Sequence, residues 1–470
     1  MFLCSRLFSF SNISLSYPEV LLVTIHGCSR FPSGKGKPAN HFINRTTIRT
    51  MELRRVVVTG LGAVTPIGND VNTYWNNLLA GVSGATRITH FDPTLFKSAI
   101  ACEVKDFNGE DYFDRKEIRK IDPYAQFAIA AATEAIHDAD LNLEAEDLDR
   151  IGCILGVGIG GIRTFEESLY EFGRTEEQGP RFSPFLVPKM IADMGAGLIS
   201  IRFGLRGPNY ATAAACASGT CAIADAFNLI RLGKASAIVA GGAEAAVSKC
   251  AIGGFGSMHA LSCRNDSPET ASRPFSASRD GFVLGEGAGI VILEELEHAK
   301  ARGAKIYAEL AGTGLSADAY HMTASHPDGL GAIKVMQNAL EDAEMKPEDI
   351  DYINTHGTST PVGDVSEVKA ILSVFGEHAY HLSIDSTKSM TGHLLGAAGG
   401  IEAIATVLAV KNDIIPPTIN HEEGDEDENI DYRLNFTFNH AQQRTVRAAL
   451  SNTFGFGGHN ACVLFKKYAD

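Results

Sequence analysis

Short apolar runs alternate along the chain with longer stretches in which apolar residues recur at helical spacing. This alternation predicts strands separated by helices, and therefore an α/β protein with buried sheets. The predicted strands lie at 55–60, 151–156, 237–242 and 290–293. The predicted helices, rich in Ala, Leu and Ile, lie at 124–139, 219–232, 330–343 and 401–410.

Part of this pattern occurs twice. A helix end with the sequence AIHDA, at 135–139, leads through the acidic turn EDLDR into a predicted strand at 151. About two hundred residues later, ALEDA at 339–343 leads through EDIDY into a strand in the same way. Repetition of a whole supersecondary unit indicates two related halves, which we place at 51–305 and 306–470.

Residues 1–50 do not share this pattern. They are rich in Ser and Phe, and they contain six basic residues but only one acid, Glu19. This composition resembles an organelle transit peptide, although prolines interrupt any amphipathic helix. We interpret Met51 as the start of the folded body and the segment before it as dispensable, which predicts a cytoplasmic protein. The alternative, a transit peptide, predicts a mitochondrion or plastid.

The charge of the chain excludes one class of partner. From Met51 onward 35 basic residues face 55 acidic ones, a net charge of −20. Such a body is a poor general binder of nucleic acid, and an anionic partner would need a local basic patch. Nowhere does the chain approach the roughly 18 uncharged apolar residues of a membrane span, so we expect none.

The nine cysteines are odd in number and scattered, with no CxxC pair, which excludes a disulfide framework and a zinc ribbon. Most are expected to be buried free thiols. Cys216 differs because small residues surround it in AACASG, directly before a predicted helix. Unpaired N–H groups and the helix dipole at that position favour a thiolate, and small neighbours admit a bulky substrate. A buried structural cysteine is the alternative.

Two histidines accompany this thiol. His356 lies in NTHGTST, directly after the second strand of the repeat, where α/β proteins place catalytic groups. His393 lies in KSMTGH, five residues after Lys388. Together they suggest a thiol nucleophile with donors for a developing anion. Zinc is the alternative, but no ligand pair has the close spacing of a zinc site, so we expect no metal.

Two further segments carry candidate chemistry. The loop NTFGFGG at 452–458 can offer backbone N–H groups to an oxyanion, with the alternative of a tight sheet turn. Lys116, Arg119 and Lys120 fall at i, i+3 and i+4, which predicts one cationic helix face. In an acidic body this face is either a docking site for an acidic partner or an ordinary solvated surface.

Seven segments in order along the chain resemble the elongating β-ketoacyl-[acyl-carrier-protein] synthases, in particular the synthase II group. The resemblance covers 51–470 and none of 1–50. The segments are VVVTGLG at 56–62, AACASG at 214–219, GGFG at 253–256, SRPF with RDGF at 272–282, HGTST at 356–360, the stretch 388–399, and FGFGG at 454–458.

The resemblance implies a thiolase-like fold, in which two duplicated α/β halves form a layered αβαβα arrangement, usually as a homodimer. It implies a decarboxylative condensation of acyl carrier protein (ACP) thioesters, acyl-ACP and malonyl-ACP, to 3-oxoacyl-ACP, CO2 and ACP in fatty-acid elongation. No organic cofactor is implied. The implied partner is the acidic ACP itself.

The same resemblance implies residue roles. Cys216 would carry the acyl chain as a thioester, while His356 and His393 assist decarboxylation and stabilise the enolate. Lys388 would support the electrostatics of the histidine pair. The N–H groups of Cys216 and Phe456 would form the oxyanion hole, with the Phe456 ring as a gate.

It also implies where substrates bind. Thr358 and Thr360 would hydrogen-bond the pantetheine arm, and Ile159 and Phe255 would line the acyl pocket. The residues that would meet the ACP are Lys116, Arg119, Lys120 and Arg181.

The chain departs from the family at three positions. His259 stands where an arginine of the carrier patch is common, which predicts weaker or pH-dependent docking. His459 replaces a usual Thr beside the oxyanion loop, and Cys263 replaces another Thr without an expected effect.

Three rival functions follow from the same residues: a degradative thiolase, a non-catalytic chain-length partner subunit, and a cysteine hydrolase. A thiolase needs a second catalytic cysteine near the C-terminus, and Cys462 lies in a strand-like run instead. The retained Cys216 argues against the partner subunit, and the decarboxylation residues argue against the hydrolase.

Overall fold

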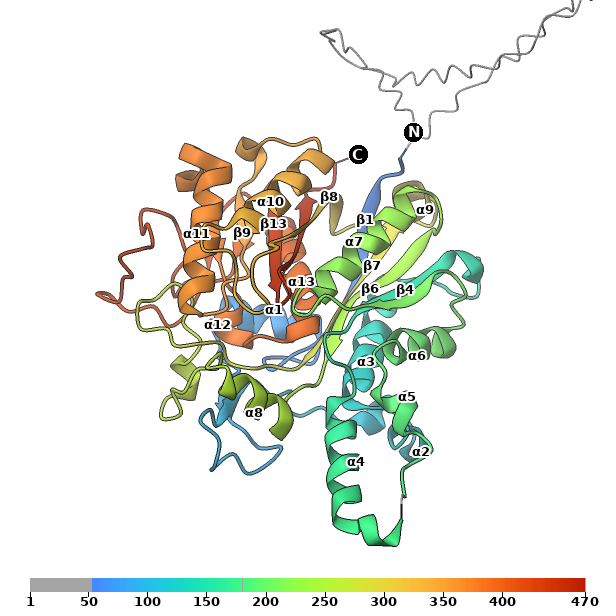
Figure 1. Ribbon diagram of the computed structural model, residues 1–470. Helices are drawn as coiled ribbons and strands as arrows, with labels where there is room; N and C mark the ends of the chain where they lie inside the picture. The colour runs from blue at the N-terminus through green and yellow to red at the C-terminus, as the bar shows by residue number, and fades with distance from the viewer. Residues whose placement is uncertain (1–52, 180, 470) are drawn as a thin grey trace, which may run out of the picture. The chain divides into compact units, whose positions relative to one another are not determined.

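The computed structural model describes residues 53–179 and 181–469 (Figure 1). The predicted extension 1–50 lies outside these residues, and with it the choice between a dispensable segment and a transit peptide. Over the part that is described, no helix is both long and apolar enough to cross a membrane.

Ten strands form one mixed sheet made of two sets of five. The sheet order is β1-β7-β6-β4-β5 in the first set and β8-β14-β13-β9-β10 in the second. The first set comprises β1 (Val56–Val64), β4 (Ile151–Gly156), β5 (Asn209–Thr212), β6 (Ala237–Glu244) and β7 (Gly287–Glu295). The second comprises β8 (Ala308–Ala317), β9 (Tyr352–Asn354), β10 (Ser383–Asp385), β13 (Ala448–Gly455) and β14 (His459–Lys466).

The two sets have the same internal pairing. In each, the first two neighbouring pairs are antiparallel and the last two are parallel. The sets meet where β1 pairs with β8. The predicted duplication is therefore present in the sheet itself, while the division between residues 305 and 306 stays a prediction.

Helices form three layers around these strands (Figure 1). α7 (Ser218–Arg231) and α13 (Ala398–Asn412) contact strands of both sets and make the central layer. α3 (Pro123–Asp138) and α6 (Met194–Phe203) pack on the first set. On the second set lies α10 (Leu330–Asp342), with α11 (Pro361–Phe375) packed against it. This is the predicted αβαβα layering.

The repeated sequence unit occupies equivalent places in the two halves. α3 ends before a 3-10 turn at Leu148–Arg150 that feeds β4, and α10 ends before a 3-10 turn at Pro347–Asp349 that feeds β9. Both strands hold the fourth position of their set.

The other α-helices of the described chain, and its two small sheets, lie outside these layers' main elements. They are α1 (Val71–Leu79), α2 (Arg115–Ile118), α4 (Ile162–Thr175), α5 (Leu186–Met190), α8 (Lys249–Ser257), α9 (Leu296–Ala301), α12 (Lys388–Thr391), and the small sheets of β2 (Thr86–Arg87) with β3 (Ile100–Ala101) and β11 (Ile414–Ile415) with β12 (Gln442–Gln443).

The expected cationic helix face is wrong in one respect. α2 spans only Arg115–Ile118, so Arg119 and Lys120 lie in the turn that follows it. The helix stops because Asp122 caps α3, whose first residue is Pro123. The cations at 116, 119 and 120 are nevertheless all exposed.

α13 is buried on every side because sheet strands and α7 surround it, and all its residues from 398 to 410 are buried, Glu402 and Thr406 included. Gly400 permits the close approach of α13 to β7. A Cβ at this position would lie 2.2 Å from the carbonyl oxygen of Gly289 in β7. The sequence therefore needs glycine here to bring the central helix against the sheet.

We expect Gly400→Ala to lower the free energy of unfolding by about 3 kcal/mol, because the added methyl group forces α13 away from β7. Denaturant titration of the full chain measures this change. Gly173→Ala in α4 is the control, since a Cβ there meets nothing within 4 Å. Equal stability of the two variants would contradict the close approach.

Candidate active site

One cavity of ≈ 340 Å³ brings together seven of the predicted site residues. They come from five separate segments that follow strands or form short helices and loops of both halves. These residues are Cys216, Phe255, His356, Thr358, Thr360, His393 and Phe456.

Cys216 lies on a sharp turn between β5 and α7. Ala215 has a positive φ of 49°, a conformation that L-residues rarely adopt. The Ser218 hydroxyl fixes this turn, since it accepts from the N–H of Ala214 at 2.8 Å and donates to the carbonyl of Ala215 at 2.6 Å. The thiol is buried, and the backbone N–H groups of Cys216 and Phe456 interact with its sulfur.

The expectation of a thiolate at Cys216 is not supported. Burial raises the pKa of the Cys216 thiol to about 12, although the Lys388 charge and the Phe456 N–H act in the opposite direction. The thiol lies two residues before the first residue of α7 and is buried, so desolvation outweighs the nearby positive groups. Burial therefore favours the neutral thiol at Cys216.

His356 and His393 face each other across the cavity. Their ring centroids are 5.2 Å apart and the rings are nearly perpendicular, at 87°. Burial lowers the pKa of both imidazoles well below 6.5, and the positive charge of Lys388 lowers it further. Both rings are therefore neutral at pH 7, and each provides one N–H donor.

Backbone hydrogen bonds hold both histidines in place. The Glu367 carboxylate on α11 accepts the N–H groups of His356 and Gly357, each at 2.9 Å. The N–H of His393 donates to the carbonyl of Val283 at 2.8 Å, and its own carbonyl accepts the N–H of Gly285 at 2.9 Å. Each ring therefore projects from a fixed backbone.

Lys388 is buried and does not line the cavity. It is 1% exposed and forms a buried ion pair with Glu402 of α13. The positive charge of its ammonium group lowers the pKa of the Cys216 thiol and of the His356 and His393 imidazoles. A buried cation close to a neutral imidazole pair can stabilise negative charge that develops between them.

Sequence reasoning missed three buried carboxyl groups around this site. Glu244 accepts backbone N–H groups from the 158–160 loop and from Gly396, and burial raises its pKa to about 7. Glu367 and Glu402 are the other two, and burial raises their pKa to about 7 as well. A usable signal existed, because Glu244 and Glu402 each stand alone in an apolar run.

Several predicted residues lie away from the cavity. Ile159, on the loop before α4, is 40% exposed and does not line it. Arg181 is exposed, and the Lys120 ammonium lies 5.5 Å from the ring centroid of Phe185.

The two histidines that depart from the family pattern lie in different places. His259 lines the cavity and is exposed, whereas His459 is exposed at the start of β14. Among the described residues, no His, Cys, Asp or Glu cluster could hold a metal ion.

The sequence of the chain matches a known protein family. Family models for the N-terminal and C-terminal domains of β-ketoacyl synthase match residues 53–299 and 307–422. A 3-oxoacyl-[acyl-carrier-protein] synthase 2 of Staphylococcus aureus is 51% identical over 416 residues, which are 88% of this chain and 99% of that protein. The protein of the same name from a Synechocystis species is 50% identical over 419 residues, 89% of this chain and 99% of that one.

Solved structures agree with the sequence matches. A β-ketoacyl synthase from Burkholderia phymatum has a TM-score of 0.81 at 33% identity, covering 89% of this chain and 100% of that chain. The complex of a type II PKS acyl-carrier protein with its ketosynthase, bound to the hexaketide, has a TM-score of 0.82 at 35% identity and the same coverage.

Proposed function

The chain belongs to the β-ketoacyl synthase family, and from this membership we propose that it condenses acyl-ACP with malonyl-ACP through an acyl thioester on Cys216. The products are 3-oxoacyl-ACP, CO2 and ACP. The observation that carries the proposal is the meeting of Cys216, His356 and His393 in one cavity, with the Phe456 N–H beside the sulfur.

The first half-reaction loads the acyl chain. The Cys216 sulfur attacks the thioester carbon of acyl-ACP, the bond from that carbon to the carrier sulfur breaks, and the Cys216 proton ends on the carrier sulfur, which leaves as a thiol. The tetrahedral intermediate carries an oxyanion, which the N–H groups of Cys216 and Phe456 stabilise. A preorganised donor of this kind contributes roughly 3–4 kcal/mol in the transition state. Because burial favours the neutral thiol, we propose that its proton is transferred as the sulfur attacks.

The second half-reaction forms the carbon–carbon bond. Malonyl-ACP loses CO2, and the electron pair moves to the thioester oxygen, where His356 and His393 donate hydrogen bonds to the enolate. The enolate carbon then attacks the acyl carbonyl on Cys216. The bond between the acyl carbon and the Cys216 sulfur breaks, and the sulfur takes up a proton from solvent. Thr358 and Thr360 position the pantetheine arm, and Phe255 bounds the acyl chain.

The rival functions have less support. Cys462, the only late cysteine, is fully buried in β14 and does not line the cavity, which argues against a thiolase. The nucleophile and both histidines share the cavity, which argues against a non-catalytic partner subunit. We propose that the reaction uses no organic cofactor and that the protein is cytoplasmic.

We also propose a homodimer. β5 ends the sheet, and Tyr210 on it is 38% exposed. α6 packs against β5, and α4, α5 and α6 expose large apolar side chains, namely Phe165, Leu169, Tyr170, Val187 and Ile201. An open sheet edge next to an apolar surface favours pairing with a second copy. Ile159, directly before α4, would then be covered by the partner.

A two-step experiment tests the condensation. The full chain receives a medium-chain acyl-ACP and then malonyl-ACP, with intact-protein mass spectrometry after each step. An acyl adduct on Cys216 that disappears as a β-ketoacyl-ACP two carbons longer forms supports the proposal. An adduct that only hydrolyses, or no adduct on folded protein, contradicts it.

The pH dependence of CO2 release tests the state of the histidines. Lowered pKa values keep His356 and His393 neutral as the pH falls through 6.5. We therefore expect kcat for malonyl-ACP decarboxylation to stay level between pH 8 and pH 6 and to fall only in more acidic solution. A profile that drops to half near pH 6.5 would indicate ordinary, solvated imidazoles.

Charge reversal tests the docking patch. Lys116→Glu with Arg119→Glu should raise KM for acyl-ACP about tenfold, because the ACP is acidic and meets these cations from solution. Acylation by a small thioester should not change. The matched control, Lys234→Glu with Lys334→Glu, reverses two exposed charges elsewhere. An equal loss with both substrates, or in both double variants, would refute the patch.

A further inference from the structure

The guanidinium of Arg279 holds the segment that leads from the two predicted pantetheine-binding threonines into α11. Its Nε donates to the carbonyl of Thr360 at 3.1 Å, and Nη2 donates to the carbonyl of Pro361 at 2.7 Å. Nη1 donates to Ser276 in its own loop at 2.7 Å. Because the guanidinium is planar and its donors have fixed directions, these bonds fix both carbonyl groups.

This segment is one wall of the catalytic cavity. Thr358 and residues 360–363 line it, and the Thr358 and Thr360 hydroxyls are 3.0 Å apart. Between them Ser359 has a positive φ of 68°, so the wall depends on external contacts to keep its shape. The Arg279 loop supplies one more, since the N–H of Gly281 donates to the Ser359 carbonyl at 3.0 Å.

Arg279 cannot itself reach substrate. Its side chain is 1% exposed, and it is paired with two carboxylates. Asp364 Oδ2 lies 3.4 Å from Nε, and Asp427 Oδ2 lies 2.8 Å from Nη2. Asp364 is fully buried and also accepts the N–H of Phe275 at 2.9 Å. Any effect of Arg279 on catalysis must therefore pass through the backbone that it holds.

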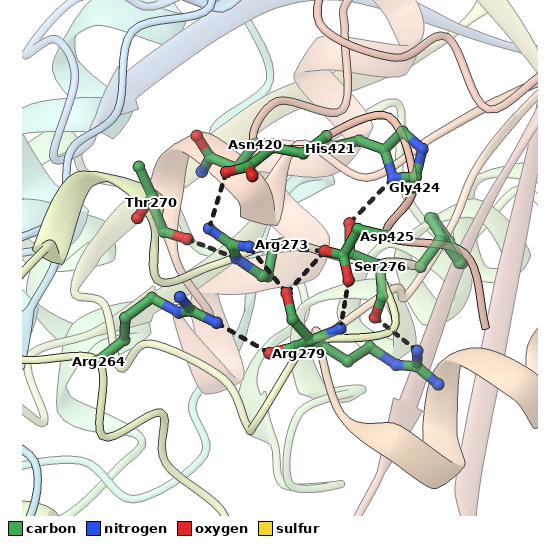
Figure 2. A network of polar contacts seen from close by, with 12 residues as sticks. Arg264, Thr270, Arg273, Ser276, Arg279, Asn420, His421, Gly424 and Asp425 are labelled. Carbon is green, nitrogen blue, oxygen red and sulfur yellow. Dashed lines mark hydrogen bonds and ion pairs between the residues drawn. The ribbon is translucent and has the colours of Figure 1, made fainter.

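An outer segment, residues 420–427, keeps the Arg279 loop in position (Figure 2). Asp425 accepts the backbone N–H of Ser278 at 2.8 Å and its hydroxyl at 2.6 Å, and it forms an ion pair with Arg273 at 3.5 Å. His421 Nδ1 lies 3.0 Å from the hydroxyl of Ser276. The loop that carries Arg279 is thus fixed from outside while Arg279 fixes the cavity wall on the inside.

We propose that Arg279 is a positioning residue for thioester binding: it holds the carbonyl groups of Thr360 and Pro361 so that the Thr358 and Thr360 hydroxyls meet the carrier's arm. The inference rests on the proposed function, because the arm is the ligand of this wall. It assigns Arg279 no contact with the reacting atoms.

The decisive variant is Arg279→Lys in the full chain. Lysine keeps the charge beside Asp364 and Asp427 but loses the planar fork that bonds two carbonyls at once. We expect KM for both ACP substrates to rise about tenfold, with kcat and the rate of Cys216 alkylation by iodoacetamide within twofold of the parent. Asp427→Asn, which removes the negative charge of the outer partner of Arg279, should raise KM by about twofold to threefold.

The matched control is Arg264→Lys. Arg264 donates to the Ser278 carbonyl of the same loop at 3.0 Å, yet makes no hydrogen bond to residues 358–363. An unchanged KM in Arg279→Lys, or a raised KM accompanied by large losses in kcat and in the alkylation rate, would overturn the inference. Absence of condensation in the parent chain would instead overturn the proposed function.

Discussion

The Cys216→Ala variant is expected to lose condensation by about 10⁴-fold or more, because no other thiol lines the cavity of the described chain to carry the acyl group. Release of CO2 from malonyl-ACP should continue, since His356 and His393 are neutral donors independently of the thiol. Chromatographic measurement of β-ketoacyl-ACP, together with a CO2 assay on the same samples, separates the two steps.

The control for this variant is Cys250→Ala, which removes an exposed thiol outside the cavity. It should elongate at the parental rate. Elongation by Cys216→Ala at more than a trace would mean that the acyl chain is carried elsewhere or transferred directly. Loss of CO2 release together with condensation would show that the thiol also takes part in decarboxylation.

The sequence predicted the frame of the site well because its elements have strong local signals. The repeated helix–turn–strand unit is present in both halves, and His356 follows β9 as the repeat implies. Strand-end loops converge at one region of an α/β fold, so separate motifs could be assigned to one site before any geometry was known. In contrast, nothing in the sequence around Gly400 indicates that a strand passes close to this position.

The electrostatics of the site could not be predicted in the same way. A helix N-terminus favours a thiolate, but the pKa of Cys216 depends on how completely the cavity excludes water. Likewise, Glu367 reads as one charged position on a helix, whereas in the fold it accepts two backbone N–H groups of the histidine loop. Burial and long-range pairing decide both, and neither is encoded in a short motif.

The exposure of Ile159 could not be predicted from the sequence either. Ile159 belongs by resemblance to the acyl pocket, yet a single chain leaves it on the surface beside α4. If the homodimer forms through β5, the second copy covers this region. A residue whose surroundings come from another chain cannot be placed from one sequence, or from one chain.

The second large effect concerns His393. We expect His393→Ala to lower malonyl-ACP decarboxylation by about 10³-fold, because it removes one of two donors to the enolate, and removal of one such donor costs 10²–10³-fold in related oxyanion sites. Acylation of Cys216 should stay within about threefold of the parent, since the N–H groups of Cys216 and Phe456 serve that oxyanion. CO2 release and intact-mass analysis measure the two steps separately.

The control is His440→Ala, which removes an exposed imidazole that does not line the cavity. Thermal unfolding of His393→Ala identifies any general loss of structure, which would lower acylation as well. Normal decarboxylation in folded His393→Ala would leave His356 and the buried charge of Lys388 to stabilise the enolate alone. Loss of decarboxylation with acylation preserved would establish that the thiol and the histidine pair perform separable steps within one cavity.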